Sequence, residues 1–372
     1  MKLKELILNN IDTIKALRKE LHDNAELSYK EYKTQEIITN FLEGIGIPTE
    51  QAAVTGVVAT LNQGSQCIAV RADMDALPVN GVSHVCGHDY HMAITCGTAF
   101  ILKKLGYDKA VKFIFQPAEE AEGGADFMIK EGVLENPQVT NMIGFHVWPN
   151  VKVGTIEAAP GPSMGSVDEF KITFKGKGGH AAMPHQCKNP MYPAMDFIKA
   201  INEKSRMDIN PLDSHVINFS SIQCGNAPNV IADECTILGT VRTFNNALRN
   251  KIYEMLLQVA GLSAERYGCK AIVKYSFQYP PLVNDRAYTN TFIDITKKLL
   301  GEDKVIPLEK TFAAEDFAFF AEKVPSVHFR LGIADEEIGI QPLHSACFNA
   351  HEDAIFYGIY VMVNFILSTA DR

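Results

Sequence analysis

Short apolar runs followed directly by polar or ionisable residues recur along this chain. CIAVRA (67–72) runs into RADMDALP, and VKFIFQ (111–116) is followed by QPAEE. Helix-like segments lie between such runs, and NMIGFHV (141–147) and SVHFRLGI (326–333) repeat the pattern. This alternation predicts an α/β domain with a largely buried sheet. Because functional groups in open α/β sheets gather beyond the carboxyl ends of strands, we expect a site there.

The pattern changes near Pro160-Gly161-Pro162 and changes back after Pro280-Pro281. Between these points the predicted order is βαββαβ, a compact module in its own right. Its predicted strands are DEFKITFKG, VINFSSIQ, ECTILGTVRT and AIVKYSFQY, and its helices cover 190–206 and the region of Leu248 to Leu262. The sequence therefore predicts a first domain part at 1–165, an inserted domain at 166–281 and a second domain part at 282–372.

Composition excludes several classes of partner. The chain has 372 residues, 47% of them hydrophobic, and a formal charge of -9, so no broad basic surface is expected for nucleic acid or anionic membrane. Small molecules or other proteins are the expected partners. The eight cysteines are far apart with no CxxC pair, which is typical of a reduced, cytoplasmic protein. The N-terminal segment predicts an amphipathic helix, and 354–367 predicts a buried helix too short to span a bilayer.

The stretch HVCGHDYH (84–91) has three interpretations when taken alone. Cys86 and His88 are close enough to bind one metal ion or a bridged pair, and a thiolate with imidazoles suits zinc. A buried cysteine beside structural histidines is the second interpretation. A cysteine nucleophile paired with His88 is the third.

Partners elsewhere in the chain favour the metal site. Glu119 and Glu120 follow a strand, where one carboxylate could bind metal while the other faces water, as zinc hydrolases require. His146 is predicted to end its strand, and His344 lies in a loop after the last strand. Each histidine is weak support singly. Together with Cys86 and His88, these residues predict metal ligands that converge from separate strand ends.

Six motifs in order resemble one family: RADMDALP, CGHDYH, QPAEE followed by Gly-Gly, GKGGHAAMPH, APNVIAD and AAEDF. They are similar to the metal-dependent aminoacylase and carboxypeptidase superfamily. Within it, the cysteine form of the metal motif resembles the subgroup of indole-3-acetyl-amino-acid hydrolases, hippurate hydrolases and N-acetyl-diaminopimelate deacetylases. The resemblance covers nearly the whole chain. It implies a zinc-peptidase-like catalytic domain, with a central mixed sheet flanked by helices, and an inserted ferredoxin-like lid domain.

The resemblance also implies roles for individual residues. It implies a site for two divalent ions, with zinc expected and manganese, cobalt or nickel as alternatives, and a homodimer formed through the lid. Asp75 looks like a residue that orients a ligand. His91 matches its motif, but a ligand role does not follow from that. The implied ligands are Cys86, His88, Glu120, His146 and His344, the implied general base is Glu119, and the implied substrate-binding residues are His180, Asn229 and Arg242.

The expected reaction is hydrolysis of the amide bond of an N-acyl amino acid. His180 would stabilise the developing oxyanion, and Arg242 would pair with the α-carboxylate. The alternatives are an N-acetyl-diaminopimelate deacetylase, a dipeptidase or carboxypeptidase, a cysteine hydrolase, a structural zinc site and a catalytically inactive binder. The chain departs from the family at Ala25, where proline is usual, and in the short VNGVS segment (79–83), which bears on substrate specificity.

Overall fold

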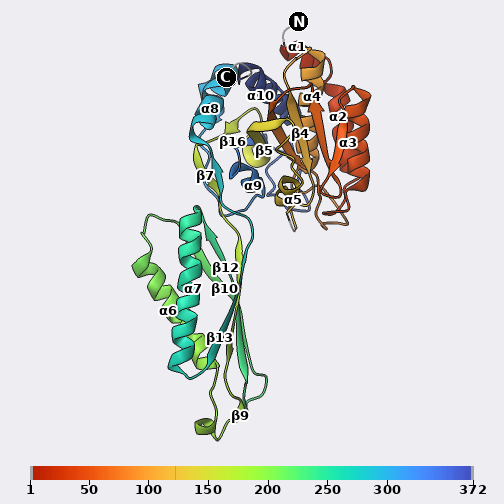
Figure 1. The fold of residues 1–372 in the computed structure, drawn as a ribbon. Helices are drawn as coiled ribbons and strands as arrows, with labels where there is room; N and C mark the ends of the chain where they lie inside the picture. Colours follow the sequence, from red (N-terminus) through yellow and green to blue (C-terminus); the bar gives the residue numbers. More distant parts are fainter. Residues whose placement is uncertain (1–2, 122, 370–372) are drawn as a thin grey trace. The chain divides into compact units, whose positions relative to one another are not determined.

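A computed structural model describes residues 3–121 and 123–369. The chain forms two compact units (Figure 1). The first comprises the described residues up to 163, together with 283–309 and those from 316 onward. The second comprises 164–282 and the short segment 310–315, which no sequence pattern indicated.

The first unit is built on a mixed sheet of eight strands in the order β1-β2-β4-β3-β5-β16-β6-β15. Strands β4, β3, β5 and β16 run parallel, β2 is antiparallel to β4, and β6 is antiparallel to β16. The mixed sheet with flanking helices confirms the predicted fold class. The strands are β1 (Thr49–Ala52), β2 (Gly56–Leu61), β3 (Gln66–Asp73), β4 (Val111–Gln116), β5 (Gln138–Lys152), β6 (Ile156–Glu157), β15 (Val305–Ile306) and β16 (Ser326–Ala334).

One large apolar core lies between this sheet and the helices on one face, and α4 and α10 are buried along most of their length. The opposite face carries the polar positions of the same strands, including Asp73 and His146, since side chains alternate along a strand. The helices of this unit are α1 (Leu3–Leu8), α2 (Ile11–Asp23), α3 (Tyr32–Gly44), α4 (His88–Lys104), α5 (Ala125–Lys130), α8 (Arg286–Leu300), α9 (Phe317–Ala321) and α10 (Asp353–Thr369).

Two local predictions differ from the structure. The N-terminal segment forms two helices, because the Asn10 side chain donates a hydrogen bond to the Leu6 carbonyl at 2.7 Å and competes with helix continuation. His146 does not end its strand: β5 continues to Lys152, because β16 stays paired with it as far as Ala334. Among the described residues, no helix combines the length and apolarity needed to cross a bilayer.

The second unit has the predicted βαββαβ order. Its antiparallel sheet has the order β10-β12-β8-β13, and α6 and α7 pack on one face around a separate apolar core. Strands β9 and β11 pair as a separate two-stranded ribbon. In the sequence, β9 follows β8 and β11 precedes β12. The elements are β8 (Asp168–Lys175), β9 (Gly179–His180), α6 (Met191–Asp208), β10 (His215–Cys224), β11 (Val230–Ile231), β12 (Glu234–Thr243), α7 (Asn246–Arg266) and β13 (Lys270–Phe277). Strands β7 (Gly161–Met164) and β14 (Leu282–Asn284) pair separately, and short 3-10 helices cover Pro184–Gln186 and Glu302–Lys304.

Candidate metal centre

Gly87 sets the turn that presents Cys86 and His88. It lies directly before α4 with φ +83°, a conformation that glycine adopts without a steric penalty. A Cβ at Gly87 would also come within 2.3 Å of the Val147 side chain. Glycine therefore lets the start of α4 approach β5, where His146 lies.

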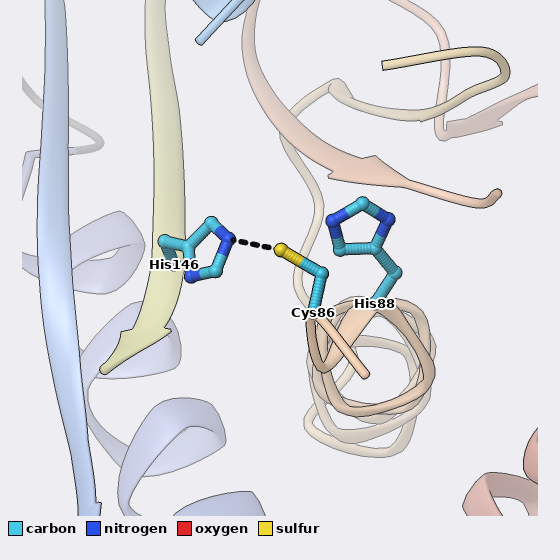
Figure 2. A group of neighbouring side chains, drawn as sticks. All are labelled: Cys86, His88 and His146. Atoms are coloured by element: carbon cyan, nitrogen blue, oxygen red, sulfur yellow. Dashed lines mark hydrogen bonds between the residues drawn. The ribbon is translucent and has the colours of Figure 1, made fainter. Parts of the chain in front are cut away.

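Cys86 is at the centre of a group of imidazoles. Its Sγ lies 3.4 Å from His146 Nε2 and 3.3 Å from His344 Nε2. Figure 2 shows Cys86 between His146 on β5 and His88 on α4. The ligand atoms of Cys86, His88 and His146 all lie within 4.8 Å of one another. Within this triad, Cys86 and His146 are 60 positions apart in the sequence, and the fold brings them into contact.

Glu120 connects a second group to the same place. Its Oε1 lies 3.1 Å from His344 Nε2 and 3.9 Å from His88 Nε2. Cys86, Glu120 and His344 form one close group, and His88, Glu119 and Glu120 form another. All five predicted ligands and the predicted base therefore meet in overlapping clusters of donor atoms.

His344 reaches the cluster from an irregular segment. Its φ is +65°, which is uncommon for a residue with a side chain, and its backbone N–H donates to the Val85 carbonyl at 2.9 Å. This bond fixes His344 beside the segment that contains Cys86. Its side chain is 53% exposed, whereas Cys86 and His88 are buried.

Asp75 fixes the two glutamates by their backbones. Its two carboxylate oxygens accept hydrogen bonds from the N–H groups of Glu119, at 3.1 Å, and Glu120, at 3.0 Å. Its backbone carbonyl lies 2.8 Å from His88 Nδ1, so it also sets the imidazole orientation and directs Nε2 toward the cluster. The predicted orienting role of Asp75 agrees with these contacts.

The electrostatics of this cluster favour a cation. Burial lowers the pKa of His88, but Asp73, Asp75 and Glu120 raise it to about 10. Burial, followed by the charges of Glu120 and Glu119, raises the pKa of the Cys86 thiol well above its usual value. The thiolate is the form of cysteine that binds metal, and a cation beside Cys86 would favour loss of the thiol proton.

The donor set fits divalent metal ions. His88 Nε2 is buried and has no hydrogen-bond partner within 3–121 and 123–369. An unpaired buried nitrogen is costly, and a cation at this position would satisfy it. One sulfur, three imidazole nitrogens and a carboxylate form a set that suits zinc and similar borderline ions. A closed structural zinc site would not need the additional carboxylate of Glu119 beside it.

The remaining residues of HVCGHDYH have supporting positions. His91 Nδ1 lies 2.6 Å from Asp73, and its Nε2 accepts a hydrogen bond from the Val147 N–H at 2.9 Å. Both ring nitrogens are therefore engaged, and His91 also forms a close group with Asp73 and His88. Asp89 instead binds His22 and Arg18 of α2, both at 2.8 Å. His84 is buried at 2% exposure and lies outside the donor clusters.

A buried network beneath the cluster was not predicted. Arg71 donates to Asp73 and to Asp316, both at 2.7 Å, and to Gln116 at 2.9 Å. All four side chains are buried at 1% exposure or less. Three of these residues, Arg71, Asp73 and Asp316, lie in the motifs RADMDALP and AAEDF. Charged residues among apolar ones are the sequence feature that could have indicated the network. Their mutual pairing depends on strands that are far apart in the sequence.

The substrate-binding residues predicted in the second unit fall into two groups. His180 and Asn229 are neighbours, because Val230 pairs with His180 and the Ala181 N–H donates to the Asn229 carbonyl at 3.1 Å. Arg242 lies on β12, opposite Val216. The ribbon precedes the start of β12 at Glu234, and Arg242 lies eight residues further along β12, about 26 Å at about 3.3 Å per residue. The structure does not bring these two groups together within the unit.

Comparison with known proteins identifies the family. The model of peptidase family M20/M25/M40 matches residues 69–368. The chain belongs to peptidase family M20/M25/M40. An N-acetyl-L-cysteine deacetylase of Bacillus subtilis is 35% identical over 93% of this chain and 85% of that protein. A thermostable carboxypeptidase 2 of Saccharolobus solfataricus is 34% identical over 96% of this M20 chain and 95% of that protein.

A solved structure of the M20 family has the same fold. It is a dinuclear metal binding peptidase from Bacillus subtilis, with a TM-score of 0.83 and 30% identity. The match covers 97% of this chain and 98% of the other. The similarity therefore extends over both units of the M20 chain.

Proposed function

We propose that this protein is a metal-dependent amidohydrolase that cleaves N-acyl amino acids to a free amino acid and a carboxylic acid. The observation that carries the proposal is the convergence of Cys86, His88, Glu120, His146 and His344, with Glu119 in the adjacent cluster. The similarity to an N-acetyl-L-cysteine deacetylase supports this substrate class. The eight free cysteines support a reducing, cytoplasmic location.

The five ligands would hold two divalent ions, with zinc as the expected metal and manganese, cobalt or nickel as alternatives. When bound, such ions supply Lewis-acid activation of the carbonyl and lower the pKa of water to about 7. Glu119 is 8% exposed and belongs to the donor cluster of His88 and Glu120. From this position it would accept a proton from the attacking water and transfer it to the leaving nitrogen.

Residues of the second unit would bind the substrate. His180 would donate a hydrogen bond to the developing oxyanion, Asn229 would contact the substrate beside it, and Arg242 would pair with the α-carboxylate. Burial lowers the pKa of Arg242, but a guanidinium remains charged at neutral pH.

We further propose a homodimer formed through the second unit. One N-acyl amino acid is far shorter than the stretch of β12 from Glu234 to Arg242, which is about 26 Å for eight residues at about 3.3 Å per residue, and the His180 ribbon precedes that stretch. A single substrate molecule therefore cannot contact both groups of one chain. In a dimer, the two chains would each contribute one group to a given substrate.

The same site supports two related reactions. The similarity to a carboxypeptidase keeps peptide hydrolysis as a second candidate function. Deacetylation of N-acetyl-diaminopimelate is a special case of the main proposal. No described residue was identified that would bind the second charged end of that substrate.

A substrate panel tests the proposal. The protein is reconstituted with zinc or manganese and incubated with acetyl, benzoyl and indole-acetyl amino acids, N-acetyl-diaminopimelate and dipeptides, and the released amine is measured. Release from the acyl amino acids supports the main proposal. Release from dipeptides alone would favour the peptidase, and release from none of them would contradict both.

A further inference from the structure

The loop after β4 that contains Glu119 and Glu120 is held by its backbone. Its N–H groups donate to three buried carboxylates that come from different parts of the chain. These bonds run from Ala118 to Glu31 at 3.0 Å, from Glu119 and Glu120 to Asp75 at 3.1 and 3.0 Å, and from Gly124 and Ala125 to Asp316 at 3.0 and 3.1 Å. Asp75 and Asp316 adjoin the metal centre and its supporting network. Glu31 belongs to neither.

Ala118 has an unusual backbone conformation. Its φ is +57°, in the left-handed region, where a residue with a Cβ is uncommon and is retained only when its surroundings hold it. The next residue is Glu119, so the conformation of Ala118 decides the direction in which that carboxylate leaves β4. A contact that stabilises Ala118 in this conformation therefore acts on the orientation of the proposed base.

Burial of the Glu31 carboxyl group destabilises the folded protein unless hydrogen bonds compensate for it. It is fully buried, and burial is the main cause that raises its pKa. Its Oε1 accepts from the Ala118 N–H, and its Oε2 accepts from the Thr55 hydroxyl at 2.6 Å. Its contact with Ala118 crosses 87 positions of sequence, so it is not a by-product of local structure.

Tyr29 forms a hydrogen bond with the other end of the same loop. Its hydroxyl donates to the Gly123 carbonyl at 3.1 Å. The Gly123 N–H in turn donates to the Ala118 carbonyl at 3.0 Å, which closes the loop. The segment from Tyr29 to Glu31 therefore contacts both ends of the loop that presents the two glutamates.

We infer that Glu31 is a positioning residue for amide hydrolysis: it holds Ala118 in the left-handed conformation and thereby directs Glu119 toward the reacting atoms. The predicted effect of Glu31 on kcat rests on the proposed function. The contact itself does not depend on that function. Tyr29 supports the same loop from its opposite end.

Kinetics of three variants of the metal-loaded enzyme test this role. Glu31→Met removes the acceptor, Glu31→Gln keeps an amide oxygen that can accept from Ala118, and Tyr29→Phe removes only the second tie. We expect Glu31→Met to lower kcat by about 10-fold to 100-fold, the usual range for groups that orient a metal site, with KM and metal content unchanged. Glu31→Gln should recover most of the rate, and Tyr29→Phe should lose less than Glu31→Met.

Glu26→Ala is the matched control. Glu26 accepts from the backbone N–H groups of Lys33 and Thr34, both at 2.9 Å, at the start of the same helix that Glu31 precedes. Among the described residues, the Glu26 carboxylate bonds only to Lys33 and Thr34, so its loss should lower the melting temperature while kcat stays near the wild-type value. An equal loss of kcat in Glu26→Ala and Glu31→Met would overturn the positioning role. Wild-type kcat in Glu31→Met would overturn it as well.

Hydrogen exchange separates this inference from the proposed function. Peptides that contain Ala118 and Glu119 should exchange faster in Glu31→Met than in the wild type or in Glu26→Ala, whether or not any substrate is turned over. If the wild type hydrolyses no acyl amino acid, the proposed function fails while the exchange result still reports on the contact. Unchanged exchange would overturn the inference independently. If Glu31→Met does not fold, Tyr29→Phe tests the support of the same loop, and kcat and exchange both unchanged from the wild type in that variant would overturn the inference.

Discussion

The carboxylate of Asp75 accepts the backbone N–H of Glu119 at 3.1 Å, so a residue after β3 fixes the proposed base after β4. Asp75→Asn would retain one acceptor oxygen and lose the second. We therefore predict a loss of about 10-fold to 100-fold in kcat/KM, typical for the loss of a group that orients a metal ligand. Steady-state kinetics with N-acetyl amino acids measure this, and activity within about 2-fold of wild type would show that the orientation is set elsewhere.

His344 is the most exposed of the proposed ligands, at 53%. His344→Ala should therefore fold but lose metal, because removing one imidazole weakens one of the two proposed ion sites. Mass spectrometry of the purified variant measures metal content per chain. His351→Ala is a suitable control, since His351 faces Asp335 at 3.6 Å and lies outside the donor clusters. Two ions per chain in the His344 variant would exclude His344 as a ligand.

Chelation and thiol alkylation distinguish the metal enzyme from a cysteine hydrolase. The burial of Cys86 predicts slow alkylation of its sulfur. We expect a chelator to abolish activity and added metal to restore it, while mild alkylation of the exposed Cys347 has little effect. An enzyme that resists the chelator and is inactivated by alkylation would contradict the metal site.

Complementation tests whether two chains share one site. Glu119→Gln and His180→Ala each inactivate a homodimer if both roles are correct. When the two variants are unfolded and refolded together, a site with intact Glu119 can meet an intact His180 of the other chain. Random association should then recover roughly a quarter of the wild-type activity. No recovery in a sample shown to contain mixed dimers would mean that His180 acts within its own chain or not at all.

The sequence predicted most of the fold because its apolar periodicities are regular. The strands 67–72, 111–116 and 326–333 lie within β3, β4 and β16, and the βαββαβ order of the second unit was read from alternating patterns. The break between α1 and α2 was missed, since it depends on the Asn10 side chain rather than on periodicity. The extension of β5 beyond His146 was missed because it depends on pairing with a distant strand.

The site prediction rests on residue types that are unusual in their positions. Histidines and paired glutamates after apolar strands are conspicuous, and the structure brings Cys86, His88, Glu119, Glu120, His146 and His344 together. The positioning contacts were not predictable from the sequence pattern. Glu31 resembles any other glutamate before a helix, and only the folded chain reveals its hydrogen bond to Ala118.

The most direct measurement is turnover by metal-loaded Glu119→Gln. The substitution keeps the size of the side chain and removes the group that accepts the proton, while the ligand set stays intact. We predict that the variant binds two ions per chain, as the wild type should, and hydrolyses an N-acyl amino acid roughly 10²-fold to 10⁴-fold more slowly. Near-wild-type turnover at full metal content would contradict Glu119 as the base, and with it the proposed mechanism.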